Sequence, residues 1–112
     1  MARIKSIIPQ DFNTCYCRDS KCKGRLEAHH MIYGRGRRAI SDREGLIVML
    51  CQWHHKGTDG VHGKNGDKIK LYLQQIAQET WEQNFIKEYP YKNHAEEAAR
   101  EAWIRMMGAN YL

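Results

Sequence analysis

The chain has 112 residues, of which 42% are apolar, 28% charged and 10% aromatic, and its formal net charge is +5. This composition is that of an ordinary globular protein and excludes the fibrous and intrinsically disordered classes. The longest apolar stretch, Leu46–Cys51, is far shorter than the roughly 20 residues that cross a bilayer, and the first ten residues lack the apolar block of a signal peptide. We therefore expect a single cytoplasmic domain, 1–112, without a membrane partner.

Positive charge is concentrated in the first part of the chain. Residues 1–70 contain 14 Lys and Arg against 7 Asp and Glu, whereas residues 71–112 contain 4 against 6. Such a surplus suits a phosphate backbone, although solubility alone is a sufficient reason for an excess of this size. We expect a nucleic acid, DNA or RNA, as the partner, and we expect the first part of the chain to make the contact. The sequence does not indicate an oligomeric state.

Two short runs have the composition of β-strands. Leu46–Leu50 is rich in β-forming residues and Leu26–Ile32 is a shorter candidate, so the simplest arrangement is an antiparallel pair. Between them, Tyr33–Arg43 is rich in Gly and Arg and is expected to be a long, mobile loop.

Three arginines lie in that expected loop. The guanidinium group matches phosphate geometry and is always protonated, so these side chains are suited to phosphate contact, and one of them to stabilising a charged transition state. The alternative is a solvated basic loop. The residues are Arg35, Arg37 and Arg38.

Two amphipathic helices are expected after Gly66. Apolar residues recur at three- and four-residue spacing from Ile69 to Phe85, with Asp67 as a suitable N-cap, and again through 94–107, with Asn93 as a possible cap. We expect residues 67–107 to form a helical scaffold whose apolar side contributes core aromatic residues rather than base-stacking ones. These aromatic residues are Trp81 and Trp103.

The cysteines and one histidine have the spacing of a zinc site. Cys51 and His54 form a CxxH pair, and Cys17 and Cys22 form a CxxxxC pair that runs into a Lys-Gly turn. Four cysteines in a reducing compartment are more typical of metal ligands than of disulfides. Two such pairs predict one structural zinc site of the Cys3His type, with Cys15 as the alternative to Cys17.

Four further histidines in the same part of the chain remain outside that site. His29 and His30 are neighbours on the first expected strand, so they point to opposite faces and cannot both enter one core. His55 directly follows the zinc ligand His54, and His62 lies one short glycine-rich loop later. A group of this kind indicates a polar purpose, although His62 alone would be an ordinary exposed loop histidine.

Together these residues resemble the HNH endonucleases, also called ββα-metal or His-Me finger nucleases. The resemblance covers roughly 15–63 and includes the Ala-His-His-Met-Ile run at 28–32, the strand and cysteine at 45–51, the histidine pair at 54–55 and the Val-His pair at 61–62. Stretch 41–46 and the ending Gly108–Leu112 are similar to those of small phage and prophage nucleases. A phage or prophage origin, with action in the host cytoplasm, is what this likeness implies.

The resemblance implies a role for each of these four histidines. His30 corresponds to the general base, and His29, His55 and His62 correspond to ligands of a catalytic divalent metal, either Mg²⁺ or Mn²⁺, with Zn²⁺ and Ni²⁺ as further candidates. A neutral histidine can take a proton from water at pH 7, and a metal offsets the charge that develops on the phosphate oxygens. Cleavage would leave 5′-phosphate and 3′-hydroxyl ends.

One element of the family pattern is missing. The middle Asn is absent, and Gly45 stands nearest its place. In the family that Asn braces the loop between the strands, so Asp42 or Ser41 is expected to brace it here.

We therefore expect an α+β domain: a zinc-stapled β-hairpin and short helix of ββα-metal type in 15–63, followed by the two C-terminal helices. The expected activity is metal-dependent hydrolysis of DNA phosphodiester bonds. No base-reading element is apparent, so little sequence specificity and a strong salt dependence are expected. The alternative is a non-catalytic, zinc-dependent module that binds DNA or recruits another protein.

Overall fold

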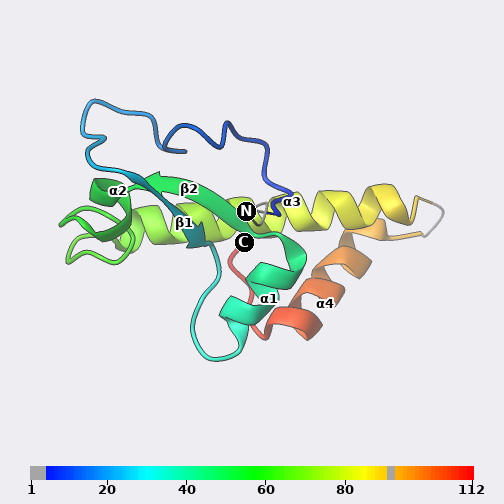
Figure 1. Cartoon of the computed structure of the whole chain (residues 1–112). Helices are drawn as coiled ribbons and strands as arrows, with labels where there is room; N and C mark the ends of the chain where they lie inside the picture. Colours follow the sequence, from blue (N-terminus) through cyan, green and yellow to red (C-terminus); the bar gives the residue numbers. More distant parts are fainter. Residues whose placement is uncertain (1–4, 91–92) are drawn as a thin grey trace.

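The computed structural model describes residues 5–90 and 93–112. The elements in chain order are β1 (Leu26–His30), α1 (Arg37–Glu44), β2 (Ile47–Cys51), α2 (Gln52–Lys56), α3 (Asp67–Glu88) and α4 (Ala95–Met107). The class is α+β, as expected: the two strands form an antiparallel hairpin, which crosses in front of the long helix α3 in Figure 1. None of the helices in the described ranges is long and apolar enough to cross a bilayer.

The hairpin register determines which way the two adjacent histidines face. His29 pairs with Val48 and His30 with Ile47. His29 is 2% exposed, whereas His30 is only partly buried, because successive residues of a strand point to opposite faces. The hairpin therefore separates one buried histidine from one that solvent can reach.

Strand β2 is buried along its whole length, and the N-terminal segment forms hydrogen bonds along its outer edge. Ser6 Oγ donates a hydrogen bond to the Ile47 carbonyl at 2.6 Å, and Tyr16 N donates to the Met49 carbonyl at 2.7 Å. The side-chain oxygen of Gln10 accepts from Met49 N at 2.9 Å. The segment leads directly to the cysteines, so the same bonds place Cys15 beside the end of β2.

The segment Tyr33–Arg43 is not the mobile loop expected from its composition, because its second half belongs to helix α1. The glycines mark the helix ends: Gly36 precedes it with φ 78°, and Gly45 follows it with φ 74° and donates to the Ser41 carbonyl. A Cβ at Gly45 would lie 3.2 Å from Ile7 N, so a larger residue is disfavoured there.

Helices α3 and α4 pack against each other and close the core, as their periodicity predicts. Trp103 is fully buried, and its ring centroid lies 5.7 Å from that of Trp81. The expected caps are displaced by one residue: Gly66 precedes α3, which begins at Asp67, and His94 rather than Asn93 precedes α4.

Candidate metal centres and the histidine pocket

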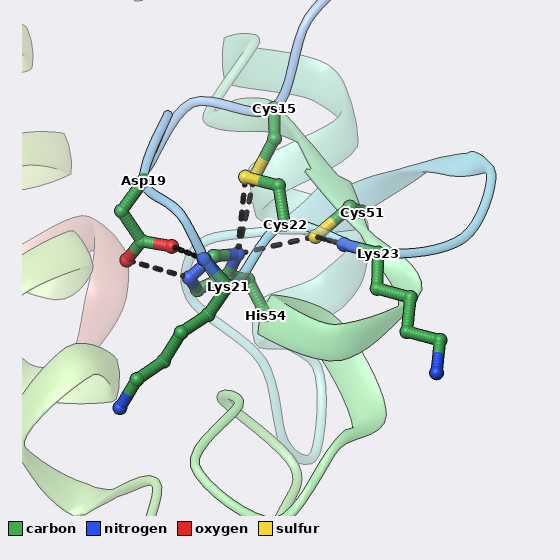
Figure 2. Close-up of polar contacts among 7 residues, drawn as sticks. All are labelled: Cys15, Asp19, Lys21, Cys22, Lys23, Cys51 and His54. Carbon is green, nitrogen blue, oxygen red and sulfur yellow. Dashed lines mark hydrogen bonds and ion pairs between the residues drawn. The ribbon is translucent and has the colours of Figure 1, made fainter.

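Four side chains from separate parts of the chain converge next to the end of β2. The Nδ1 atom of His54 lies 3.5 Å from the sulfur of Cys15, 3.6 Å from that of Cys22 and 3.1 Å from that of Cys51. Figure 2 shows these contacts meeting at one ring nitrogen, and the four donor atoms all lie within 4.8 Å of one another. Three sulfurs and one imidazole are a typical tetrahedral donor set, so this Cys3His cluster could bind a metal ion such as zinc.

Asp19 orients the histidine of the cluster. His54 Nε2 lies 3.0 Å from Asp19 Oδ2, and because a carboxylate only accepts, the proton is on Nε2. The lone pair of Nδ1 then faces the sulfurs, which is the arrangement that ligating histidines usually have. The Lys21 backbone amide donates to the other Asp19 oxygen at 2.8 Å, and this bond together with His54 lowers the pKa of Asp19.

Cys17 is not part of the cluster, which corrects the first choice of ligands made from spacing. Cys15, the alternative, takes its place. The bond from Tyr16 N to β2 fixes the chain between the two cysteines, and it leaves Cys15 5% exposed inside the cluster and Cys17 outside it. Burial raises the pKa of Cys17 to about 12, so this thiol stays protonated at neutral pH.

The pKa of the Cys51 thiol is lowered, whereas that of Cys17 is raised. Its burial acts to raise its pKa, but hydrogen bonds from the backbone amides of His54 and Lys23 outweigh this and lower the pKa to about 6. Because the thiolate is the metal-binding form, the backbone prepares Cys51 as a ligand at neutral pH.

A second cluster brings together His29, His55 and His62. Their ligand atoms lie within 4.8 Å of one another, and the ring centroid of His29 is 5.1 Å from that of His55 and 5.4 Å from that of His62. His29 Nε2 is buried and has no hydrogen-bond partner among the described residues. An unsatisfied buried polar atom is costly, and a bound cation would satisfy it.

Short-range backbone pairing positions His62 next to His55. After α2 the chain turns back, so that Val61 N donates to the His54 carbonyl and His62 N to the His55 carbonyl, both at 2.9 Å. A Cβ at Gly63 would lie 1.8 Å from a backbone oxygen of Gly57, so this compact loop requires glycine.

Burial and hydrogen bonding suit the histidines of this cluster to bind a cation. Burial lowers the pKa of His29 to about 3, and the neighbouring His55 and His62 act in the same direction. His29 is therefore neutral at pH 7. His55 Nδ1 lies 3.0 Å from Glu27 Oε1 and donates a hydrogen bond to it. The Nε2 atom of His55 is therefore free to bind a cation.

His30 stands beside this cluster and is oriented by Asp42. Its Nε2 lies 2.8 Å from Asp42 Oδ1, so Nε2 carries the proton and Nδ1 is the acceptor. Ser41, the other expected brace, is buried and exchanges hydrogen bonds with both backbone groups of Ile32. Ser41 thus anchors α1 to the chain after β1, while Asp42 contacts the histidine.

The histidines line an open pocket of about 450 Å³. Its rim is basic and includes Arg38 and Lys56, and Tyr33 forms part of its wall, with its ring 4.8 Å from that of His62. The three arginines that we expected to contact phosphate lie in three different surroundings. Arg38 lines the pocket, Arg35 is exposed, and Arg37 instead donates to the Met107 and Gly108 carbonyls at the end of α4.

Sequence reasoning missed the acidic and basic residues that support the two clusters. Asp19 and Glu27 each accept from a histidine of a different cluster, and Lys56 lies on the pocket rim. Spacing gave no signal for them, because each meets its partner through the fold. Comparisons with known protein families, with curated proteins and with solved structures find no match to this chain.

Proposed function

We propose that this protein is a metal-dependent endonuclease of HNH type that hydrolyses DNA phosphodiester bonds with little sequence preference. The observation that carries the proposal is the convergence of His29, His55 and His62 beside an Asp42-oriented His30, in a pocket with a basic rim. Phosphodiester hydrolysis needs a base on one side of the phosphorus and positive charge near the leaving oxygen. His30 would be that base, and a cation held by the other three histidines would supply that charge.

The donor set of the histidine cluster favours a transition metal. Three neutral imidazoles suit Zn²⁺, Ni²⁺ or another borderline cation better than Mg²⁺, which prefers oxygen ligands. His29, His55 and His62 would hold this ion, with Glu27 orienting His55. When bound, the metal would polarise the phosphodiester and offset charge on the leaving oxygen. Zinc in the Cys3His cluster would have a structural role.

His30 would act as the general base. Its Nδ1 takes a proton from water as the water oxygen bonds to phosphorus, and the P–O3′ bond breaks, leaving a 5′-phosphate and, after protonation, a 3′-hydroxyl. Asp42, hydrogen-bonded to Nε2, holds the required tautomer and stabilises the imidazolium that forms. Arg38 on the rim would bind a non-bridging phosphate oxygen.

Conversion of supercoiled plasmid to nicked and linear forms tests this function. The purified protein is compared with His30→Asn, in Mg²⁺, Mn²⁺, Zn²⁺, Ni²⁺ or chelator. We expect cleavage only with metal, and a loss of roughly 100-fold or more in His30→Asn, as is usual when a general base is removed.

A matched control is His94→Asn, which replaces an exposed histidine at the start of α4. It should cleave as the unmodified protein does. Absence of cleavage with every metal, or equal cleavage by His30→Asn with its fold intact, would contradict the proposal and favour a non-catalytic zinc-dependent binding or recruitment module.

A further inference from the structure

A second hollow lies on the other side of helix α2 from the histidine cluster. It has a volume of about 460 Å³ and is bounded by α2 and by the turn that precedes β1. No acidic residue lines it. Its lining residues are Lys23, Gly24, Gln52, Trp53, Lys56 and Gly57.

Backbone contacts hold the aromatic ring of Trp53 in the hollow. Trp53 N donates to the Lys23 carbonyl at 3.1 Å, which ties α2 to the turn. A Cβ at Gly57 would lie 2.6 Å from the Trp53 ring, and a Cβ at Gly24 would lie 2.4 Å from the Gln52 side chain. The bare backbone of these two glycines therefore allows the close approach that fixes the partly exposed indole in place.

The hollow and the histidine pocket have one lining residue in common. Lys56 lines both. Helix α2 presents His54 to the cysteines, His55 to the histidine cluster and Trp53 to the hollow, because successive helical residues are turned by about 100°. Lys56 therefore lies next to both the histidines and the indole.

We propose that Trp53 is a stacking platform for an unpaired nucleobase, with Lys23 and Lys56 contacting the phosphates beside it. The position of the cleaved bond in the neighbouring pocket rests on the proposed endonuclease function. An indole and two lysines that line the same hollow match the chemistry of a nucleotide, which joins a flat apolar base to an anionic phosphate.

The substrate preference follows from stacking geometry. A base inside a duplex has both faces covered by its neighbours, whereas an unpaired base has a free face for the indole. Any base has such a face, so the preference is for DNA structure and not for sequence. The preferred substrate is DNA with unpaired nucleotides, as in a gap, bulge or flap, next to the cleaved bond.

The test measures binding separately from cleavage. The zinc-loaded full chain carrying His30→Asn is titrated onto a labelled duplex and onto the same duplex with a short single-stranded gap, followed by fluorescence anisotropy. We expect roughly tenfold tighter binding of the gapped DNA, within the range that one stacked base contributes. Trp53→Leu, which keeps an apolar side chain without a π-face, should abolish the difference, and Trp53→Phe should retain most of it.

Controls separate stacking from folding. Tyr72→Leu, at another exposed aromatic residue, should leave the preference unchanged. Lys23→Gln and Lys56→Gln keep Trp53 and remove one positive charge each, and each should reduce the salt dependence of gapped-DNA binding by a slope of roughly 0.7.

Two outcomes would overturn the inference. One is equal affinity for both DNAs when Trp53 is present, and the other is an equal loss of affinity for both DNAs in Trp53→Leu. Plasmid cleavage by the protein with His30 intact reports on the endonuclease independently. Cleavage without a preference for gapped DNA would support the endonuclease and contradict the stacking role of Trp53. A Trp53-dependent preference without cleavage would support the stacking role and contradict the endonuclease.

Discussion

At the scale of single residues, three carboxylates determine which ring nitrogen of three histidines carries the proton. Asp19, Glu27 and Asp42 accept from His54, His55 and His30 respectively, at 3.0, 3.0 and 2.8 Å. Each bond fixes a tautomer, so each histidine presents a defined nitrogen to its cluster or pocket.

Asp42 is predicted to position His30 for proton transfer. Asp42→Asn keeps the shape but removes the charge that stabilises the imidazolium, and Asp42→Ala also removes the hydrogen bond. We expect kcat for plasmid nicking to fall by roughly tenfold in the first and further in the second, with KM little changed. Asp11→Asn, at an aspartate far along the chain from the pocket, is the control. Unchanged kcat in both Asp42 variants would refute the assignment.

Cys15 and Cys17 are predicted to differ in their effect on metal content. Cys15→Ser removes a sulfur within 3.5 Å of His54 Nδ1, whereas Cys17→Ser changes a thiol outside the cluster. We expect elemental analysis to find about one more zinc per chain in Cys17→Ser than in Cys15→Ser, with a lower melting temperature for the latter. The reverse result would mean that Cys17 is the ligand.

At the scale of elements, one glutamate links α1 to α3. Glu44 Oε1 accepts from Trp81 Nε1 at 2.9 Å, and Arg43 donates to its other oxygen at 3.1 Å. Burial acts to raise the pKa of Glu44, but these bonds outweigh it and lower the pKa below its ordinary value of 4.5. The ionised carboxylate therefore stabilises the packing of the two helices.

This link is predicted to depend on pH. Because the folded pKa is lowered, the contribution is present above about pH 4.5 and is lost as the pH falls through the folded pKa. Glu44→Gln should reduce the free energy of unfolding by about 1 kcal/mol at pH 7 and by much less at pH 3. Urea unfolding at both values measures this. A difference that does not shrink in acid would exclude the ionised group as its source.

The N-terminal segment shows how an element without regular structure can complete a sheet. Gln10 uses both ends of its side-chain amide on β2, accepting from Met49 N and donating to the Ile47 carbonyl, each at 2.9 Å. A two-stranded hairpin is marginal in water, and this cover satisfies an otherwise open edge.

At the scale of the whole molecule, the Cys3His cluster, the histidine cluster and the helical scaffold share one core. The hydrophobic cluster runs from Ile8 through Leu50 of the hairpin and Leu73 of α3 to Trp103 of α4. The histidine pocket is therefore supported by residues from both ends of the described chain, and α3 and α4 act on the site through packing.

Two neighbouring arginines are predicted to have separable roles. Arg37 joins the start of α1 to the end of α4, whereas Arg38 lines the pocket. Arg37→Ala should lower the free energy of unfolding by about 1–2 kcal/mol and leave the salt dependence of DNA binding unchanged. Arg38→Ala should reduce that salt slope by about one and leave stability unchanged. Denaturant unfolding and salt titrations of anisotropy measure both, and exchanged effects would contradict the assignment.

Much of the fold could be predicted because its signals are local. The hairpin strands follow from β-forming composition, and α3 and α4 follow from apolar spacing along consecutive residues. The segment before β2 was predicted wrongly, because glycine and arginine suggest mobility when their contacts are unknown. In the fold Gly36 and Gly45 bound a helix, and Arg37 caps the end of another.

The sequence by itself determined the secondary-structure class and the kinds of ligand, since periodicity and the CxxH and His-His patterns are properties of neighbouring residues. Only the tertiary structure decided between Cys15 and Cys17, supplied Asp19, Glu27 and Asp42 as histidine partners, and opened a hollow beside Trp53. These choices depend on backbone hydrogen bonds and packing between residues far apart in the chain. Their geometry exists only once the hairpin, α2 and the N-terminal segment have come together.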